Sequence, residues 1–202
     1  MKLVFATNNF NKFREVKELI GPGIDLMNLK DIGCNSDIPE PYQTIEENAR
    51  EKARVINKQY GYDCFADDTA LETEGLRGRP GVYSARYASI TTGKKFCTAE
   101  QNNEANINIL FDQLKNVNNR KARFRTVICL IFKGKEIMFE GMVNGLIIKE
   151  KRGNEGFGYD PVFIPDGYNK TFAQMNLSEK NKISHRAKAF NMLADYLLKQ
   201  CS

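Results

Sequence analysis

The segment ARFRTVICLIFKGKEIMFEGMVNGLII, residues 122–148, carries most of the strand character of this 202-residue chain. It begins with alternating polar and apolar residues, becomes wholly apolar, and is interrupted by KGK at 133–135. Two such runs joined by a short turn that contains glycine are typical of an antiparallel β-hairpin. The segment therefore predicts two long paired strands.

Other strands and helices are expected on both sides of this hairpin. Short apolar runs predict buried strands at residues 2–6 and 62–66. Helical spacing of apolar residues appears in four segments: 13–20, 44–60, 101–115 and the segment that follows Ser184. Thr44 and Glu47 form a capping-box pattern at the start of the second of these. The order of elements predicts a mixed α/β fold in a single domain of two lobes.

Composition narrows the class of protein. The chain is 42% hydrophobic and 27% charged, as in ordinary globular proteins, and it contains no apolar run of the roughly 20 residues needed to cross a bilayer. Its start, MKLVFATNN, becomes polar too early for a secretory signal. Five scattered cysteines without a CxxC pair favour neither disulfides nor zinc, so we expect a reducing, cytoplasmic location.

The net charge of +5 indicates either a mildly basic surface or an anionic partner, which would be a small polyphosphate or a nucleic acid, and composition does not separate these alternatives. The basic segment NNRKARFR, residues 118–125, is the feature that favours nucleic acid. We interpret its cations as the solvated face of an edge strand. Charge alone does not choose between these partners; the motifs taken together imply a small molecule, with neither nucleic acid nor membrane.

Lys12 follows the first strand within TNNFNKFRE, residues 7–15, and falls in the first turn of a predicted helix. A cation is unfavourable at this positive end of the helix dipole unless an anion joins it. The unpaired N–H groups of a helix start also bind phosphate. From spacing alone, a phosphate site and a solvated lysine remain equally open.

Lys52 lies close to the apolar stripe of the helix at 44–60, at about 60° from its middle by a 100° step per residue. A lysine there either extends along the edge of the core or points into a cleft, and the first is favoured for an isolated residue.

Carboxylates gather in two segments. Asp67 and Asp68 follow the strand at 62–66 directly, and adjacent strand residues point to opposite sides, so one of them is expected to enter a site. Glu40 lies between Pro39 and Pro41. Such a divided set suits a hard cation such as Mg²⁺, although an Asp-Asp pair by itself more often marks a turn.

Two later segments combine rings, glycines and cations. EGFGYDPVFIPDGYNKTF, residues 155–172, places glycines beside aromatic rings, which is typical of a flat group approaching the backbone. SHRAK, residues 184–188, puts the single histidine and an arginine in the first turn of the last helix. Either residue taken alone is more often structural than catalytic.

Together these motifs resemble the inosine/xanthosine triphosphate pyrophosphatase family. The matching stretches are FATNNFNKFREV, TIEENAREKA, ADDTALETEGLRGRPGVYSARYA, GNEGFGYDPVF and EKNKISHRAKA, in family order over nearly the whole chain. The chain departs from the family pattern at Asn8, where a glycine is common, and at Thr69-Ala70, where the family commonly has Ser-Gly. The resemblance implies one domain, residues 1–202, elongated and two-lobed, with a central mixed sheet flanked by helices and an active-site cleft between the lobes.

The resemblance also implies roles for individual residues. Asp68 would be the general base and would share Mg²⁺ with Glu40. The triphosphate would be held by Thr7, Asn8, Asn9, Phe10, Asn11, Lys12 and Lys52. Further substrate contacts would come from Thr69 and from Ser84 or Arg86. The base pocket would consist of Phe157, Gly158, Tyr159, Asp160, Lys180, His185 and Arg186.

The implied activity is Mg²⁺-dependent hydrolysis of ITP, dITP and XTP to the monophosphate and pyrophosphate, by a homodimer. This chemistry needs no protein nucleophile, and the chain shows no Ser-His-Asp or Cys-His arrangement. Two alternatives remain: a pyrophosphatase of the same fold for pyrimidine or modified nucleotides, and a nucleic-acid-binding module.

Overall fold

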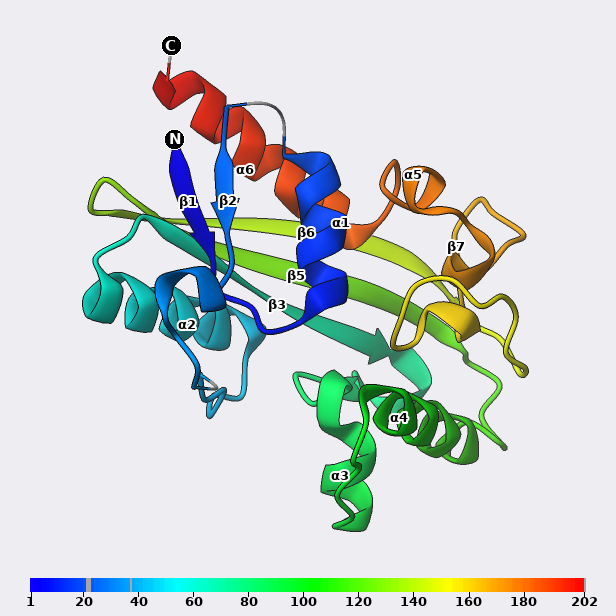
Figure 1. Cartoon of the computed structure of the whole chain (residues 1–202). Coiled ribbons are helices and arrows are strands. Elements are labelled where there is room, and N and C mark those ends of the chain that lie inside the picture. Colours follow the sequence, from blue (N-terminus) through cyan, green and yellow to red (C-terminus); the bar gives the residue numbers. More distant parts are fainter. Residues whose placement is uncertain (21–22, 37, 202) are drawn as a thin grey trace. The chain divides into compact units, whose positions relative to one another are not determined.

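The computed structural model describes residues 1–20, 23–36 and 38–201, and it divides into two compact units (Figure 1). The first unit comprises Met1–Asp68, Thr126–Gly141 and Ser184–Ser202, and the second comprises Thr69–Arg125 and Met142–Ile183. The predicted end of the first helix at Gly21-Pro22 lies outside the described residues.

The described residues form a seven-stranded mixed sheet in the order β2-β1-β3-β5-β6-β7, with β4 paired to β3. The strands are β1 (Lys2–Phe5), β2 (Asp25–Met27), β3 (Cys64–Thr73), β4 (Pro80–Gly81), β5 (Lys121–Phe132), β6 (Lys135–Ile147) and β7 (Phe163–Pro165). β1 is parallel to β2 and β3, whereas β4 and β7 pair antiparallel to their neighbours. The predicted mixed α/β class is confirmed.

The hairpin of β5 and β6 forms as predicted, and its turn explains why. Lys133 and Gly134 both have positive φ, at 48° and 76°. Positive φ at both central residues is the geometry of a type I′ turn, which matches the twist of paired strands.

In the first unit, α1 (Phe10–Leu19), α2 (Ile45–Tyr60) and α6 (His185–Cys201) begin where local capping chemistry places them. The side chains of Asn9 and Thr44 accept hydrogen bonds from Lys12 N and Glu47 N at the starts of α1 and α2. α1 packs on α6. Their shared core is apolar and includes Leu3, Phe5, Val16, Phe65, Ile128, Leu130, Phe190, Leu193 and Leu197.

The second unit has its own core and contains α3 (Tyr87–Thr92), α4 (Ala99–Gln113) and α5 (Leu177–Lys180). Its buried side chains include Leu71, Ile107, Leu110, Leu114, Phe124, Tyr159, Phe163 and Phe172. The rings of Phe124, Phe163 and Phe172 contact one another with centroids 4.8–6.2 Å apart.

Two expectations about strands are wrong. The strand predicted at 62–66 continues to Thr73, because Ala70 and Leu71 are also buried. β5 is not an edge strand, since it lies between β3 and β6. Its outward cations are nevertheless solvated or paired, and Arg123 contacts Glu72 at 2.5 Å.

Across the described residues, no helix combines the length and apolar character that membrane crossing requires. The predicted cleft between lobes stays a prediction.

Candidate active site

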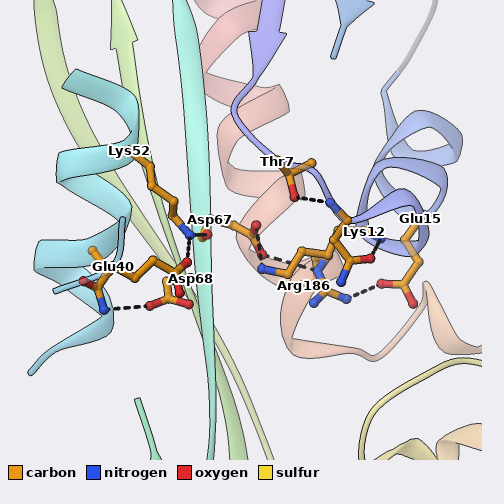
Figure 2. A network of polar contacts seen from close by, with 10 residues as sticks. Thr7, Lys12, Glu15, Glu40, Lys52, Asp67, Asp68 and Arg186 are labelled. Carbon is orange, nitrogen blue, oxygen red and sulfur yellow. Dashed lines mark hydrogen bonds and ion pairs between the residues drawn. The ribbon is translucent and has the colours of Figure 1, made fainter. Parts of the chain in front are cut away.

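The two adjacent acids of β3 organise a polar network in the first unit (Figure 2). Asp67 and Asp68 lie within the strand and not at its end, and they are 1% and 7% exposed. Successive strand residues point to opposite faces, as predicted. Both carboxylates join the network, one from each face, and the expectation that only one of them enters the site stays a prediction.

Asp67 faces α1 and α6. Its Oδ1 accepts a hydrogen bond from Lys12 Nζ at 2.9 Å, and its Oδ2 lies 3.6 Å from Arg186 Nε. Burial alone would raise the pKa of this carboxyl, but the three surrounding cations hold the pKa below its ordinary value. Asp67 is therefore an ionised carboxylate at neutral pH.

Asp68 faces α2. Asn48 Nδ2, on α2, donates to Asp68 Oδ2 at 3.3 Å. Burial and the nearby Glu40 carboxylate raise the pKa of Asp68 above its ordinary value, although Lys52 opposes the rise. The two neighbouring carboxyls therefore differ in basicity. Asp68, whose pKa is raised, is a better proton acceptor than Asp67, whose pKa is lowered.

Lys52 reaches from α2 to the same strand. Its Nζ donates to Glu40 Oε1 at 2.5 Å and to the main-chain carbonyl of Asp67 at 2.7 Å. Burial alone would lower the pKa of this ammonium, but the three surrounding carboxylates raise the pKa above its ordinary value. Lys52 is thus a buried, charged group aimed at the carboxylates, and not a lysine that extends along the core edge to solvent.

The motif at residues 7–12 covers the turn between β1 and α1 and the first residues of α1. Thr7 Oγ1 accepts from Asn9 N at 3.1 Å, and Asn9 caps the helix. Lys12 occupies the first turn of α1, as predicted, and its ammonium is directed at Asp67. Asn8 and Phe10 are exposed and Asn11 is partly exposed. This helix start can accept an anion at its N–H groups.

The residues expected to hold Mg²⁺, Glu40 and Asp68, both lie beside Lys52. Among the described residues, no group of three or more His, Cys, Asp or Glu side chains is arranged to hold a metal ion. Mg²⁺ commonly uses one or two carboxylates together with water and substrate phosphates. The oxygen-only pair therefore fits a metal that substrate helps to hold.

Arg186 and His185 are the most deeply buried of the predicted base-pocket residues in this unit, at 2% and 3% exposed. Arg186 forms an ion pair with Glu15 of α1 and lies close to Asp67. The structure thus places Arg186 beside Glu15 and Asp67, where it contributes charge to the network that contains Lys12.

The second unit holds the other candidate residues, and Asp160 lies at their centre. Asp160 Oδ2 accepts from Phe157 N at 2.8 Å and from Lys180 Nζ at 2.6 Å. Lys180 Nζ also lies 5.2 Å from the centroid of the Phe157 ring. A Cβ on Gly156 would come within 2.1 Å of Asp160 Oδ2. This contact and the φ of 73° at Gly156 both favour glycine for reasons within the chain, and the flat ligand expected from the sequence stays a prediction.

Glu155 and Gly156 are exposed in this turn, and Phe157 and Gly158 are partly exposed. Gly158 has φ of 61° and open space where a Cβ would stand. Tyr159, in contrast, is a core residue at 5% exposed, and its hydroxyl donates to Ser84 O at 3.0 Å. Its side chain belongs to the apolar core of the second unit and so anchors the turn there.

The choice left open between Ser84 and Arg86 is narrowed by the hydrogen bonds of Ser84. Its hydroxyl donates to Gly81 O at 2.5 Å and accepts from Leu71 N at 2.8 Å, in a buried position. Arg86 is partly exposed, with its guanidinium carbon 6.0 Å from the centroid of the Tyr83 ring. Thr69, on β3, is also partly exposed. Arg86 is thus the member of the pair whose side chain is open to a ligand.

Two residues of the network, Glu15 and Asn48, were not predicted, and Asp67 was predicted only as one of an acid pair of which a single member would enter the site. Asn48 stands four residues before Lys52 and so on the same face of α2, a spacing from which it could have been found. The partnership of Glu15 with Arg186 joins residues 171 apart in sequence, and no local pattern indicates it.

This chain is similar to known proteins over nearly its whole length. The model of the Ham1 family matches residues 3–196. A dITP/XTP pyrophosphatase of Christiangramia forsetii is 54% identical over 199 residues, which cover 98% of this chain and 100% of that protein. A dITP/XTP pyrophosphatase of Aquifex aeolicus is 43% identical and covers 100% of this chain and 98% of its own.

Solved structures give the same result for the fold. The Ham1 protein of Staphylococcus aureus matches with a TM-score of 0.85 and 35% identity, covering 99% of this chain and 100% of its own. A HAM1 protein from Coxiella burnetii matches with a TM-score of 0.86 and 33% identity, covering 98% and 99%. The resemblance inferred from the five motifs is confirmed.

Proposed function

Because this chain belongs to the Ham1 family, we propose that it is a nucleotide pyrophosphatase that hydrolyses deaminated purine nucleoside triphosphates. Its substrates are dITP, XTP and ITP, its products are the monophosphate and pyrophosphate, and it requires Mg²⁺. It acts on the free nucleotide pool of the cytoplasm. Relatives that match it over nearly their whole length carry the name dITP/XTP pyrophosphatase, which supports this assignment.

One observation carries the proposal beyond the family name: the opposite surroundings of Asp67 and Asp68. Asp67 is paired with cations, whereas Asp68 has an amide donor and a raised pKa. A buried carboxylate with a raised pKa next to charged lysines suits an enzyme that activates water near phosphates.

The triphosphate binds along the cations of the first unit. The start of α1 offers main-chain N–H groups, and the ammonium groups of Lys12 and Lys52 offer charge. Such a site neutralises the ground-state charge and, more strongly, the charge that develops as the pyrophosphate leaves. Thr69 and Arg86 are proposed as further substrate contacts.

Asp68 accepts a proton from the attacking water. The water oxygen bonds to the α-phosphorus, and the bond from that phosphorus to the bridging oxygen of the pyrophosphate breaks. Glu40 and Asp68 are the residues that would hold Mg²⁺, which when bound supplies charge neutralisation and acidifies water. Asn48 holds the Asp68 carboxylate in place while it takes the proton.

The purine is proposed to bind beside Phe157 and Gly158, which are partly exposed in the turn that Asp160 and Lys180 hold. An aromatic ring with open backbone next to it suits stacking on a base. Tyr159 shapes this turn from the core. His185 and Arg186 are proposed to complete recognition of the base from the start of α6.

The decisive experiment measures pyrophosphate release from dITP, XTP, ITP, dATP, GTP and dCTP, with Mg²⁺ and with EDTA. We expect turnover of the first three, at least tenfold lower kcat/KM for the others, and no turnover with EDTA. Preference for dCTP would favour the pyrimidine alternative, and no release from any nucleotide would refute the proposal. Sedimentation analysis of the same sample tests the proposed homodimer.

A further inference from the structure

The proposed reaction has no step for Asp67. This residue is 1% exposed, and the base that activates water is its neighbour Asp68. Yet Asp67 contacts both lysines proposed to bind the triphosphate (Figure 2).

The two contacts use different parts of the residue. The side chain of Asp67 accepts from Lys12 Nζ at 2.9 Å, on the face of β3 toward α1. The main-chain carbonyl accepts from Lys52 Nζ at 2.7 Å, on the side of α2. One residue of a buried strand therefore locates two cations that come from different helices.

The carboxylate is itself held in place. Arg186 Nε lies 3.6 Å from Asp67 Oδ2, and Arg186 is anchored in turn by Glu15. With one oxygen facing Arg186 and the other facing Lys12, the carboxylate has a fixed orientation at its buried position.

Each ammonium keeps N–H groups for a ligand. A lysine ammonium has three donors. Within the described residues, Lys12 donates one of them to Asp67, and Lys52 donates two, to Glu40 and Asp67. The lysines are thus oriented by the protein and still able to bind phosphate oxygens.

We propose that Asp67 is a positioning residue that orients the Lys12 ammonium toward the triphosphate and, through its main chain, places Lys52 beside it. The inference rests on the proposed function for the identity of the ligand. Asp67 does not touch the reacting atoms and acts through Lys12. This contact favours binding through preorganisation. The long lysine side chain is already ordered, so less conformational entropy is lost when the ligand binds.

A double-mutant cycle tests this with inorganic tripolyphosphate as the probe. The dissociation constant is measured calorimetrically for the native chain, Asp67→Asn, Lys12→Ala and the double variant. Removing a negative charge also strengthens attraction of an anion over distance, and that effect is the same with or without Lys12. The comparison of the two backgrounds therefore isolates what Asp67 does through Lys12.

Asp67→Asn is expected to change the dissociation constant for tripolyphosphate by a certain factor in each chain. We expect this factor to be about tenfold larger when Lys12 is present than in the Lys12→Ala chain. Glu136→Gln is the matched control. It removes a carboxylate of the same unit that pairs with Arg50 and Arg54 and not with either lysine proposed to bind the triphosphate. Its effect should stay within about twofold and be equal in the two backgrounds.

Kinetics with dITP supply the second measurement. A positioning role predicts that Asp67→Asn changes KM more than kcat, and that Asp67→Glu, which keeps the charge, restores KM to within about threefold of native. If Asp67→Asn is poorly folded by circular dichroism, Asp67→Glu and Asp67→Ser in the same cycle take its place.

The outcomes are distinguishable. Equal effects of Asp67→Asn in both backgrounds, or absence of tripolyphosphate binding by the native chain, would overturn the inference. A loss of kcat of about a hundredfold with unchanged KM would instead make Asp67 the base or a metal ligand. Binding of the probe with the expected coupling, but no nucleotide hydrolysis, would reject the proposed function and leave the inference standing.

Discussion

At the scale of single residues, Asp67 and Asp68 show how surroundings separate two identical side chains. They are neighbours on one strand, but the cations around Asp67 lower its pKa, whereas burial and Glu40 raise the pKa of Asp68. The sequence correctly predicts that the two point to opposite sides. It does not reveal what lies on each side, because Lys12 and Arg186 come from distant parts of the chain.

Replacing the proposed base tests the assignment directly. We expect Asp68→Asn to lower kcat by about 10²-fold or more and to change KM far less, since the amide keeps the shape but cannot take a proton. Steady-state kinetics at saturating Mg²⁺ measure both. Asp195→Asn, an exposed position on α6, is the control and should behave as native. Near-native turnover of Asp68→Asn would remove it from the mechanism.

Lys52→Ala should affect both binding and folding. Its ammonium is buried and bonded to two acceptors, so its loss leaves the Glu40 carboxylate and the Asp67 carbonyl without that donor. We expect a KM about tenfold higher and a destabilisation of about 1–3 kcal/mol. Chemical denaturation and kinetics measure the two effects. The control Lys58→Ala, exposed on the same helix, should change neither, and native kinetics in Lys52→Ala would make the lysine purely structural.

At the scale of elements, the helix starts and the β5–β6 turn are largely predictable, because their causes are local. Thr44 caps α2 three residues before Glu47, and Lys133-Gly134 form the tight turn between long strands. The short elements are not predictable in the same way. β2 falls in a segment that looks irregular, and its three residues form a strand only because β1 lies beside them.

Gly141→Ala tests how β6 meets the start of α6. A Cβ at Gly141 would lie 2.1 Å from His185 O and 2.5 Å from Ala189 N, and these main-chain atoms cannot move away cheaply. We expect a destabilisation of about 1–3 kcal/mol, measured by denaturant titration. Lys135→Ala, exposed at the beginning of the same strand, should stay within about 0.5 kcal/mol of native. A native-like midpoint for Gly141→Ala would show that α6 can shift away from the strand.

Thiols on β3 and β5 give a separate test of burial. Burial raises the pKa of the Cys64 and Cys129 thiols to about 12. At pH 8 the fraction of each residue in the reactive thiolate form is therefore about 10⁻⁴. In a chain with Cys97→Ser and Cys201→Ser, we expect no rapid labelling by maleimide until denaturant is added. Restoring Cys97, which is exposed, should restore one fast label. Rapid labelling of Cys64 or Cys129 in the folded chain would contradict the buried assignment.

At the scale of the whole molecule, the net charge of +5 does not require a nucleic-acid partner. Part of the basic segment is paired within the chain, since Arg123 and Arg125 both contact Glu72. We expect any affinity for single-stranded DNA or RNA to be weak and to fall steeply between about 50 and 200 mM salt. Pyrophosphate release should persist over that range, and salt-resistant, sequence-dependent binding would reopen the nucleic-acid alternative.

The sequence by itself determined the fold class, the order of the main elements and the family, because caps, turns, periodicity and motifs are properties of neighbouring residues. It also placed Lys12 and Lys52 where cations are unfavourable without an anion. Only the tertiary structure decided that Asp67 and Lys12, 55 residues apart, and Arg186 and Glu15, 171 apart, are partners. It also showed that Tyr159 is buried and donates to Ser84 O, and that a Cβ at Gly156 would meet Asp160. Such contacts join separate elements, and they depend on where packed cores bring those elements, which no local pattern contains.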